Sequence, residues 1–117
     1  MLLAIKGKHV EPRLLSSASG LCRRLDAGLD IMLSSADKKH PPLLENFIMK
    51  MQQEGIDCRL TQQDEFRSKD IVHYANTHEC ISSVMIASLS NWLAPGDEKG
   101  RNPWHKLDCP LVVAIPD

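Results

Sequence analysis

The sequence predicts an α/β fold with a single doubly wound sheet of five parallel strands. The prediction rests on an alternation along the chain, in which short apolar runs are followed by segments whose apolar residues recur at helical spacing. This alternation is typical of parallel sheets whose strands are joined by helices. Because such crossovers are right-handed, the expected strand order is 3-2-1-4-5. The 117 residues have the length of one domain, residues 1–117.

Each expected element follows from the spacing of its apolar residues. Continuous apolar runs or strict alternation predict strands, and the i, i+3, i+4, i+7 spacing predicts helices. In chain order we expect a strand at residues 2–5, a helix at 14–25, a strand at 29–33, a helix at 43–51, a strand at 56–60, a helix at about 65–79, a strand at 83–87 and a last strand at 109–115.

Proline and glycine residues mark the ends of these elements. Pro12 suits the first turn of the first helix, because its missing N–H would have no intrahelical partner there. Gly28 is expected to end that helix as a left-handed cap, and Gly55 to stop the second helix. Residues 88–108 are rich in proline and glycine, so we expect no long helix there and only one short turn at Pro103.

The composition excludes several classes of partner. With 14 Lys and Arg residues against 15 Asp and Glu residues, the net charge is −1, which gives no electrostatic reason to bind nucleic acid or an anionic membrane. Aromatic residues make up 4% of the chain, too few for a platform that stacks single-stranded bases. The opening apolar run stops at Lys6, which is too short for a signal peptide, and no run approaches the roughly 20 residues of a membrane span. We expect a cytoplasmic protein with reduced cysteines.

Neither a metal site nor a catalytic constellation is expected. The histidine and cysteine residues show no Cys-x-x-Cys, His-x-x-x-His or His-Glu-x-x-His spacing. Cys22 lies on the apolar face of the first helix and Cys58 on an inward strand position, so both are expected in the core. A small hydrolase or transferase on this fold is an alternative that no residue pattern supports. We therefore expect no enzyme activity.

Five segments, taken in order, give the chain a resemblance to a known family. They are Leu2-Leu3-Ala4-Ile5-Lys6-Gly7, Leu21-Cys22-Arg23-Arg24-Leu25-Asp26-Ala27, Gln53-Glu54-Gly55-Ile56, Asp70-Ile71-Val72-His73-Tyr74-Ala75 and Leu107-Asp108-Cys109-Pro110-Leu111-Val112-Val113. The last is the most specific, since it is similar to a closing Cys-Pro-Val-x-Val. On these segments the chain resembles the universal stress protein family across its length. The resemblance implies a Rossmann-like, adenine nucleotide alpha hydrolase-like fold, a homodimer and a non-enzymatic role in stress response or regulation.

The chain departs from that family where its ATP-binding members hold the nucleotide. Lys6 stands where those members carry an Asp, and residues 87–93 lack their glycine pair. Glycine lets backbone N–H groups approach a phosphate closely, whereas Ala87 and Ser90 obstruct that approach. We therefore expect no cofactor, with ATP and AMP both disfavoured.

A ligand crevice is nevertheless expected at the carboxyl ends of the first and fourth strands, where doubly wound sheets bind ligands. The candidate residues are Lys6, Gly7, Lys8, His9, Ser88, Ser90 and Asn91. The lysines suit an anion, which makes a small-molecule or nucleotide-binding sensor the alternative function. The competing interpretation is a solvated loop with ordinary surface lysines.

The two expected edge strands differ in protection. The third strand carries Asp57 and Arg59, charges that oppose unwanted pairing, whereas the last strand is continuously apolar and must be covered. We expect a homodimer in which this strand pairs antiparallel with its copy across a two-fold axis. The expected interface residues are Leu111, Val112, Val113, Ala114 and Ile115.

Two tryptophans fall in the segment that departs most from the family. Trp92 and Trp104 either contact an unidentified protein partner or fix this segment onto the sheet. The sequence leaves both interpretations open.

Overall fold

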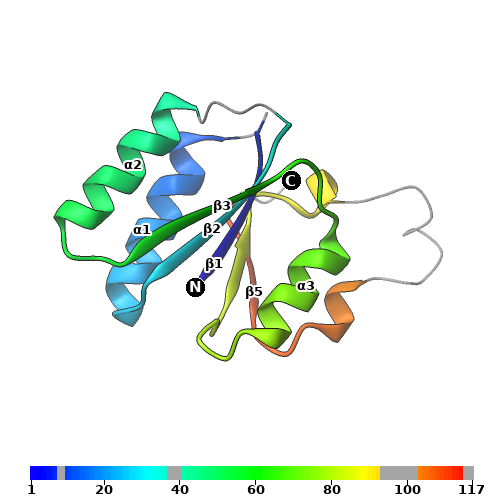
Figure 1. Cartoon of the computed structure of the whole chain (residues 1–117). Helices are drawn as coiled ribbons and strands as arrows, with labels where there is room; N and C mark the ends of the chain where they lie inside the picture. The colour runs from blue at the N-terminus through cyan, green and yellow to red at the C-terminus, as the bar shows by residue number, and fades with distance from the viewer. Residues whose placement is uncertain (8–9, 37–40, 93–102, 115–117) are drawn as a thin grey trace.

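The computed structural model describes residues 1–7, 10–36, 41–92 and 103–114. It confirms the predicted fold, since five parallel strands form one sheet in the order β3-β2-β1-β4-β5 (Figure 1). The strands are β1 at Leu2–Lys6, β2 at Leu29–Ser34, β3 at Cys58–Gln63, β4 at Val84–Ile86 and β5 at Leu111–Val113. The chain therefore has the doubly wound, Rossmann-like architecture that its alternating pattern predicts.

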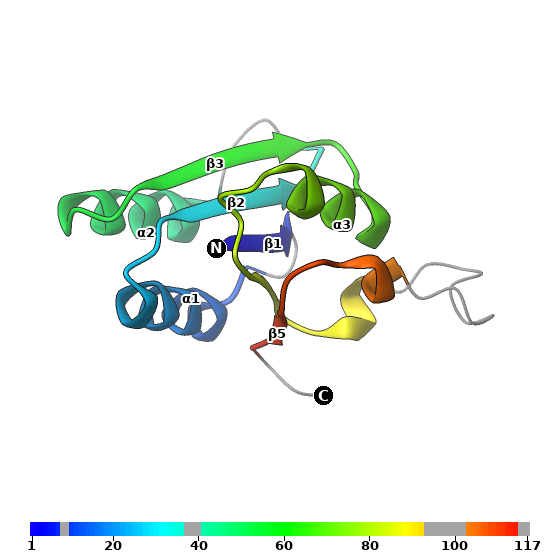
Figure 2. The same cartoon turned by 90° about the horizontal axis from the view of Figure 1, so that it is seen from below.

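Helices cover both faces of the sheet (Figure 2). The α-helices are α1 at Pro12–Leu25, α2 at Pro42–Gln53 and α3 at Ser68–Thr77, and short 3-10 helices are η2 at Leu89–Trp92 and η4 at Pro103–Lys106. Helices α1 and α2 lie on one face, and α3 lies with η2 and η4 on the other. The change of face follows from right-handed crossovers, because the chain moves outward from β1 to β3 and then crosses to β4 on the opposite side.

The central strand β1 divides the core into two parts. Leu3 and Ile5 pack with α1 and α2, whereas Leu2 and Ala4 pack with α3 on the opposite face. All four side chains are at most 2% exposed. A parallel strand that is buried on both faces has apolar residues at successive positions. The continuous apolar run in the sequence therefore predicts this strand.

The end of α1 corrects one prediction. Asp26, and not Gly28, adopts the left-handed conformation with φ of 51°, and the Ala27 N–H donates to the Cys22 carbonyl. Gly28 serves a different purpose, since a Cβ there would lie 3.1 Å from the carbonyl oxygen of Asp57 in the neighbouring turn. At the end of α2 the prediction is confirmed, because Gly55 has a φ of 83°.

Three elements are shorter than their patterns predict. Helix α3 begins at Ser68, where the Asp70 carboxylate accepts a hydrogen bond from the Arg67 N–H at 2.7 Å, and ends before His78, whose backbone is extended. Strands β4 and β5 span three residues each. Apolar residues flanking these strands pack on the core beyond the strand ends, so apolar runs overestimate strand length; Ile115 lies outside the described residues.

Asn76 connects α3 to the segment that leads into β5. Its side-chain amide donates to the Lys106 carbonyl at 2.8 Å, and its carbonyl oxygen accepts from the Asp108 N–H at 2.9 Å. These two bonds hold η4 against α3 and so fix where β5 begins. No helix within the described ranges is long and apolar enough to cross a membrane.

Candidate functional site

The predicted crevice lies at the carboxyl ends of β1 and β4. Lys6 is the last residue of β1 and is half-buried, and Gly7 follows it. A Cβ on Gly7 would lie 2.9 Å from the Cβ of Ser35, so glycine permits the close approach of the chain after β1 to the chain after β2. Ser88, beyond β4, is 7% exposed.

The structure describes less of the other predicted crevice residues. Lys8 and His9 lie outside the described residues. Ser90 and Asn91 belong to η2, and only their backbone is described. Of the seven predicted residues, the structure therefore fixes the side-chain environment of Lys6 and Ser88 and the backbone setting of Gly7.

The side chain of Trp92 packs at this end of the sheet, next to Lys6. Its ring stacks on Phe66, with centroids 5.3 Å apart and planes 20° apart. The ammonium nitrogen of Lys6 lies 5.0 Å from the Trp92 ring centroid, which is a cation–π geometry. Trp92 is only 4% exposed. The Lys6 side chain, predicted as part of an anion site, is thus directed over an aromatic ring of the same chain.

Both tryptophans pack on the core beneath α3. Trp92 is a member of that core, and Trp104 packs against it from η4 while half-buried. Their positions agree with the interpretation that they fix this segment onto the sheet. A buried ring such as Trp92 offers no surface on which a partner could dock.

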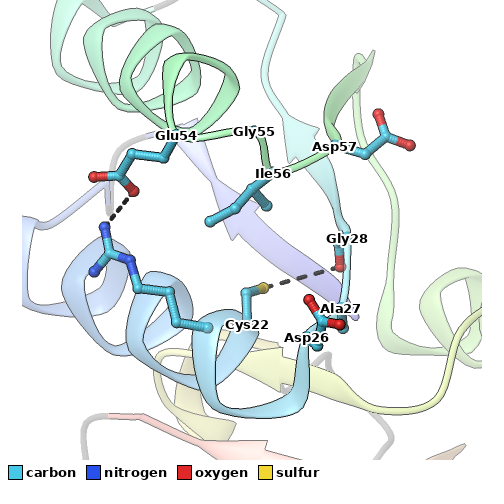
Figure 3. Close-up of a pocket in the computed structure, with 9 residues that line it drawn as sticks. Cys22, Asp26, Ala27, Gly28, Glu54, Gly55, Ile56 and Asp57 are labelled. Atoms are coloured by element: carbon cyan, nitrogen blue, oxygen red, sulfur yellow. Dashed lines mark hydrogen bonds and ion pairs between the residues drawn. The ribbon is translucent and has the colours of Figure 1, made fainter.

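A pocket, which we call the amino-end pocket, opens at the opposite end of the sheet, where the strands begin (Figure 3). It has a volume of about 420 Å³ and lies between the turn from α1 to β2 and the turn from α2 to β3. Its lining residues are Cys22, Arg23, Asp26, Ala27, Gly28, Glu54, Gly55, Ile56 and Asp57. Both α1 and α2 end here, so the negative ends of two helix dipoles border the pocket.

An ion pair spans one side of this pocket. The Arg23 guanidinium donates to the Glu54 carboxylate across 31 positions of sequence (Figure 3). This hydrogen bond holds the pKa of Glu54 below its usual value. Both partners are solvent-exposed, so the pair connects α1 to α2 but adds little stability.

The buried thiols near the pocket are poor nucleophiles. Burial raises the pKa of the Cys22 thiol, and burial raises that of Cys58 to about 11. Both thiols are therefore protonated at neutral pH, whereas nucleophilic attack needs the thiolate. Cys22 donates weakly to the Gly28 carbonyl, with 3.9 Å between sulfur and oxygen. These findings confirm both residues as core cysteines.

The described ranges contain no group of three or more His, Cys, Asp or Glu side chains arranged to hold a metal ion. Asp26 comes from the turn after α1, and Glu54 and Asp57 come from the turn after α2; the three carboxylates do not converge on one point (Figure 3). The side-chain contacts beside this pocket include the Arg23–Glu54 ion pair and the weak Cys22–Gly28 hydrogen bond.

The sequence does not predict the amino-end pocket or the stacking of Phe66 on Trp92. The pocket forms from two turns whose residues show no common motif, and the Arg23–Glu54 pair has no local spacing that predicts it. The spacing places Phe66 on the apolar face of the helix expected at about 65–79, whereas Phe66 lies before α3. Nothing in that spacing predicts its packing on a distant tryptophan.

Comparison of the chain with protein-family models, with curated proteins and with solved structures gives no match. The strand order and the helices on both faces define the class as an α/β protein with a Rossmann-like sheet. Membership of the universal stress protein family stays a prediction from the sequence.

Proposed function

We propose that the protein is a non-enzymatic regulatory protein that acts as a homodimer in the cytoplasm, in a stress response like that of the universal stress proteins it resembles. The observation that carries the proposal is the outer edge of β5, which no other described strand pairs and which bears no charged side chain from Leu111 to Ala114. An apolar edge strand left open is a template for pairing with another chain. A second copy of the same strand covers both edges at once.

The hydrogen bonds of β5 determine which backbone groups face outward. The Val84 N–H donates to the Pro110 carbonyl, and the Ala114 N–H donates to the Ile86 carbonyl, both at 2.9 Å. Because successive residues of a strand point their backbone groups to opposite sides, Val112 also faces β4. The N–H and C=O groups of Leu111 and Val113 consequently point to the open edge.

This alternation, with the two three-residue strands fully overlapped, leads to one register for the dimer. In an antiparallel pair about a two-fold axis, Leu111 of one subunit exchanges hydrogen bonds with Val113 of the partner subunit. Val112 then lies on the axis, opposite its own copy, as a non-hydrogen-bonded pair. Pro110 does not interrupt the pairing, because its position directs the missing N–H toward β4.

The opposite edge of the sheet provides the contrast. Strand β3 exposes Arg59 and Thr61, and Arg59 forms an exposed ion pair with Asp57 at 3.3 Å. Charged side chains on an edge oppose pairing with another chain. Because β3 carries exposed charged side chains and β5 carries none, β5 is favoured as the dimer interface.

Two features of the crevice support a function without bound ATP. The Trp92 ring packs beside Lys6 at the end of the sheet where this fold class binds ligands. Lys6 also provides a cation where recognition of ribose hydroxyls would need an acceptor.

The test is sedimentation velocity of Val113→Lys, with Thr61→Lys on β3 as the matched control. Val113 is 37% exposed at the open edge, so a lysine there places like charges across the two-fold axis. We expect a dimer for the wild type and for Thr61→Lys, and a folded monomer for Val113→Lys. A wild-type monomer, or a dimer that persists in Val113→Lys, would contradict the proposal.

A further inference from the structure

At the carboxyl ends of the strands, groups from separate segments enclose a flat ring. Phe66, from the connection between β3 and α3, stacks nearly parallel to the Trp92 ring, and Lys6, at the end of β1, places its ammonium over that ring. Core residues beneath α3 complete the enclosure, which leaves Trp92 4% exposed. A stacked phenyl ring and a cation over the face both favour a π system over a saturated ring of similar size.

The position of this enclosure is the one at which doubly wound sheets bind ligands. We infer that this enclosure is a binding slot for a planar aromatic group of neutral or negative charge, and that Trp92 is an autoinhibitory contact that fills it. The ammonium of Lys6 selects against a cationic ligand. A free aromatic compound enters only when the Trp92 ring has left. The inference does not depend on the homodimer, because Lys6, Phe66 and Trp92 all lie outside β5.

The covalent attachment of Trp92 explains how the slot stays closed. A side chain tethered by a short stretch of backbone acts at an effective concentration of millimolar order or higher. A free aromatic compound at micromolar concentration therefore does not displace it. Removal of the indole should leave an apolar cavity whose remaining walls still match a flat ring, and such cavities bind small aromatic molecules.

The experiment is calorimetric titration of Trp92→Ala with free indole. We expect saturable binding to this variant, and none at the same concentrations to the wild type or to Trp92→Phe, in which a ring still fills the slot. Cyclohexanol serves as the saturated probe and should bind Trp92→Ala more weakly than indole. Adding Lys6→Met to Trp92→Ala should weaken indole binding by roughly twofold to fivefold, because the ammonium over the ring is lost.

A folded Trp92→Ala that does not bind indole would overturn the inference, as would equal affinity for indole and cyclohexanol or an unchanged affinity after Lys6→Met. If Trp92→Ala alone is unfolded, indole should restore its native circular dichroism spectrum, since a ligand that binds only the folded state stabilises it. Failure of indole to restore that spectrum would equally overturn it.

Discussion

The two ends of the sheet differ in what fills the space between their loops. At the carboxyl ends of the strands the Trp92 ring, 4% exposed, lies against Phe66 and beneath the Lys6 ammonium. At the amino ends a pocket of about 420 Å³ stays open between the ends of α1 and α2. The fold class favours ligands at the first end, where among the described residues a tryptophan ring packs into the core. Topology thus fixes where loops meet, and individual side chains decide whether the space between them is open.

The largest difference between the two ends should be in stability. Trp92→Ala removes a buried aromatic ring and should lower the free energy of unfolding by about 3–5 kcal/mol. Ile56→Ala, at the half-buried floor of the open pocket, should cost only about 1–2 kcal/mol. Urea denaturation followed by circular dichroism measures both. Equal losses for the two variants would show that the carboxyl end is not the better packed.

The smallest effect should come from the ion pair at the open pocket. The hydrogen bond from Arg23 lowers the pKa of Glu54 in the folded state, so its stabilising effect is present above the unfolded pKa and is lost as pH falls through the folded pKa. Arg23→Gln should return the Glu54 pKa toward its ordinary value of about 4.3. An NMR titration of the Glu54 carboxyl carbon measures this directly. The same pKa in both proteins would mean that the pair does not persist in solution.

Most of the fold is predictable because its signals are local and repeated. The run Leu2–Ile5 is apolar throughout since both sides of β1 are buried, and the helices keep their apolar spacing because each buries one face. The end of α1 was predicted wrongly because glycine has two uses. Gly28 is needed for the approach of a neighbouring turn, while Asp26 takes the left-handed conformation itself.

The site is less predictable because it depends on contacts between distant segments. The position of Lys6 at the crevice follows from the strand order, which the sequence predicts. Its direction over the Trp92 ring does not, since this requires knowing that η2 turns back over β1. The amino-end pocket likewise combines Arg23 and Glu54, which no periodicity relates.

The pairing of β5 with its copy is the central claim, and a cross-link at the two-fold axis tests it most directly. Val112 should face its own copy with about 4.5 Å between Cα atoms, which lies within the range that a disulfide bridges. Val112→Cys is made together with Cys80→Ser, which removes the exposed native thiol. Thr61→Cys in the same background is the control on β3. Under mild oxidation Val112→Cys should give a covalent dimer on non-reducing gels while the control and the background protein stay monomeric; a Val112→Cys protein that cross-links no more than the control would contradict the account.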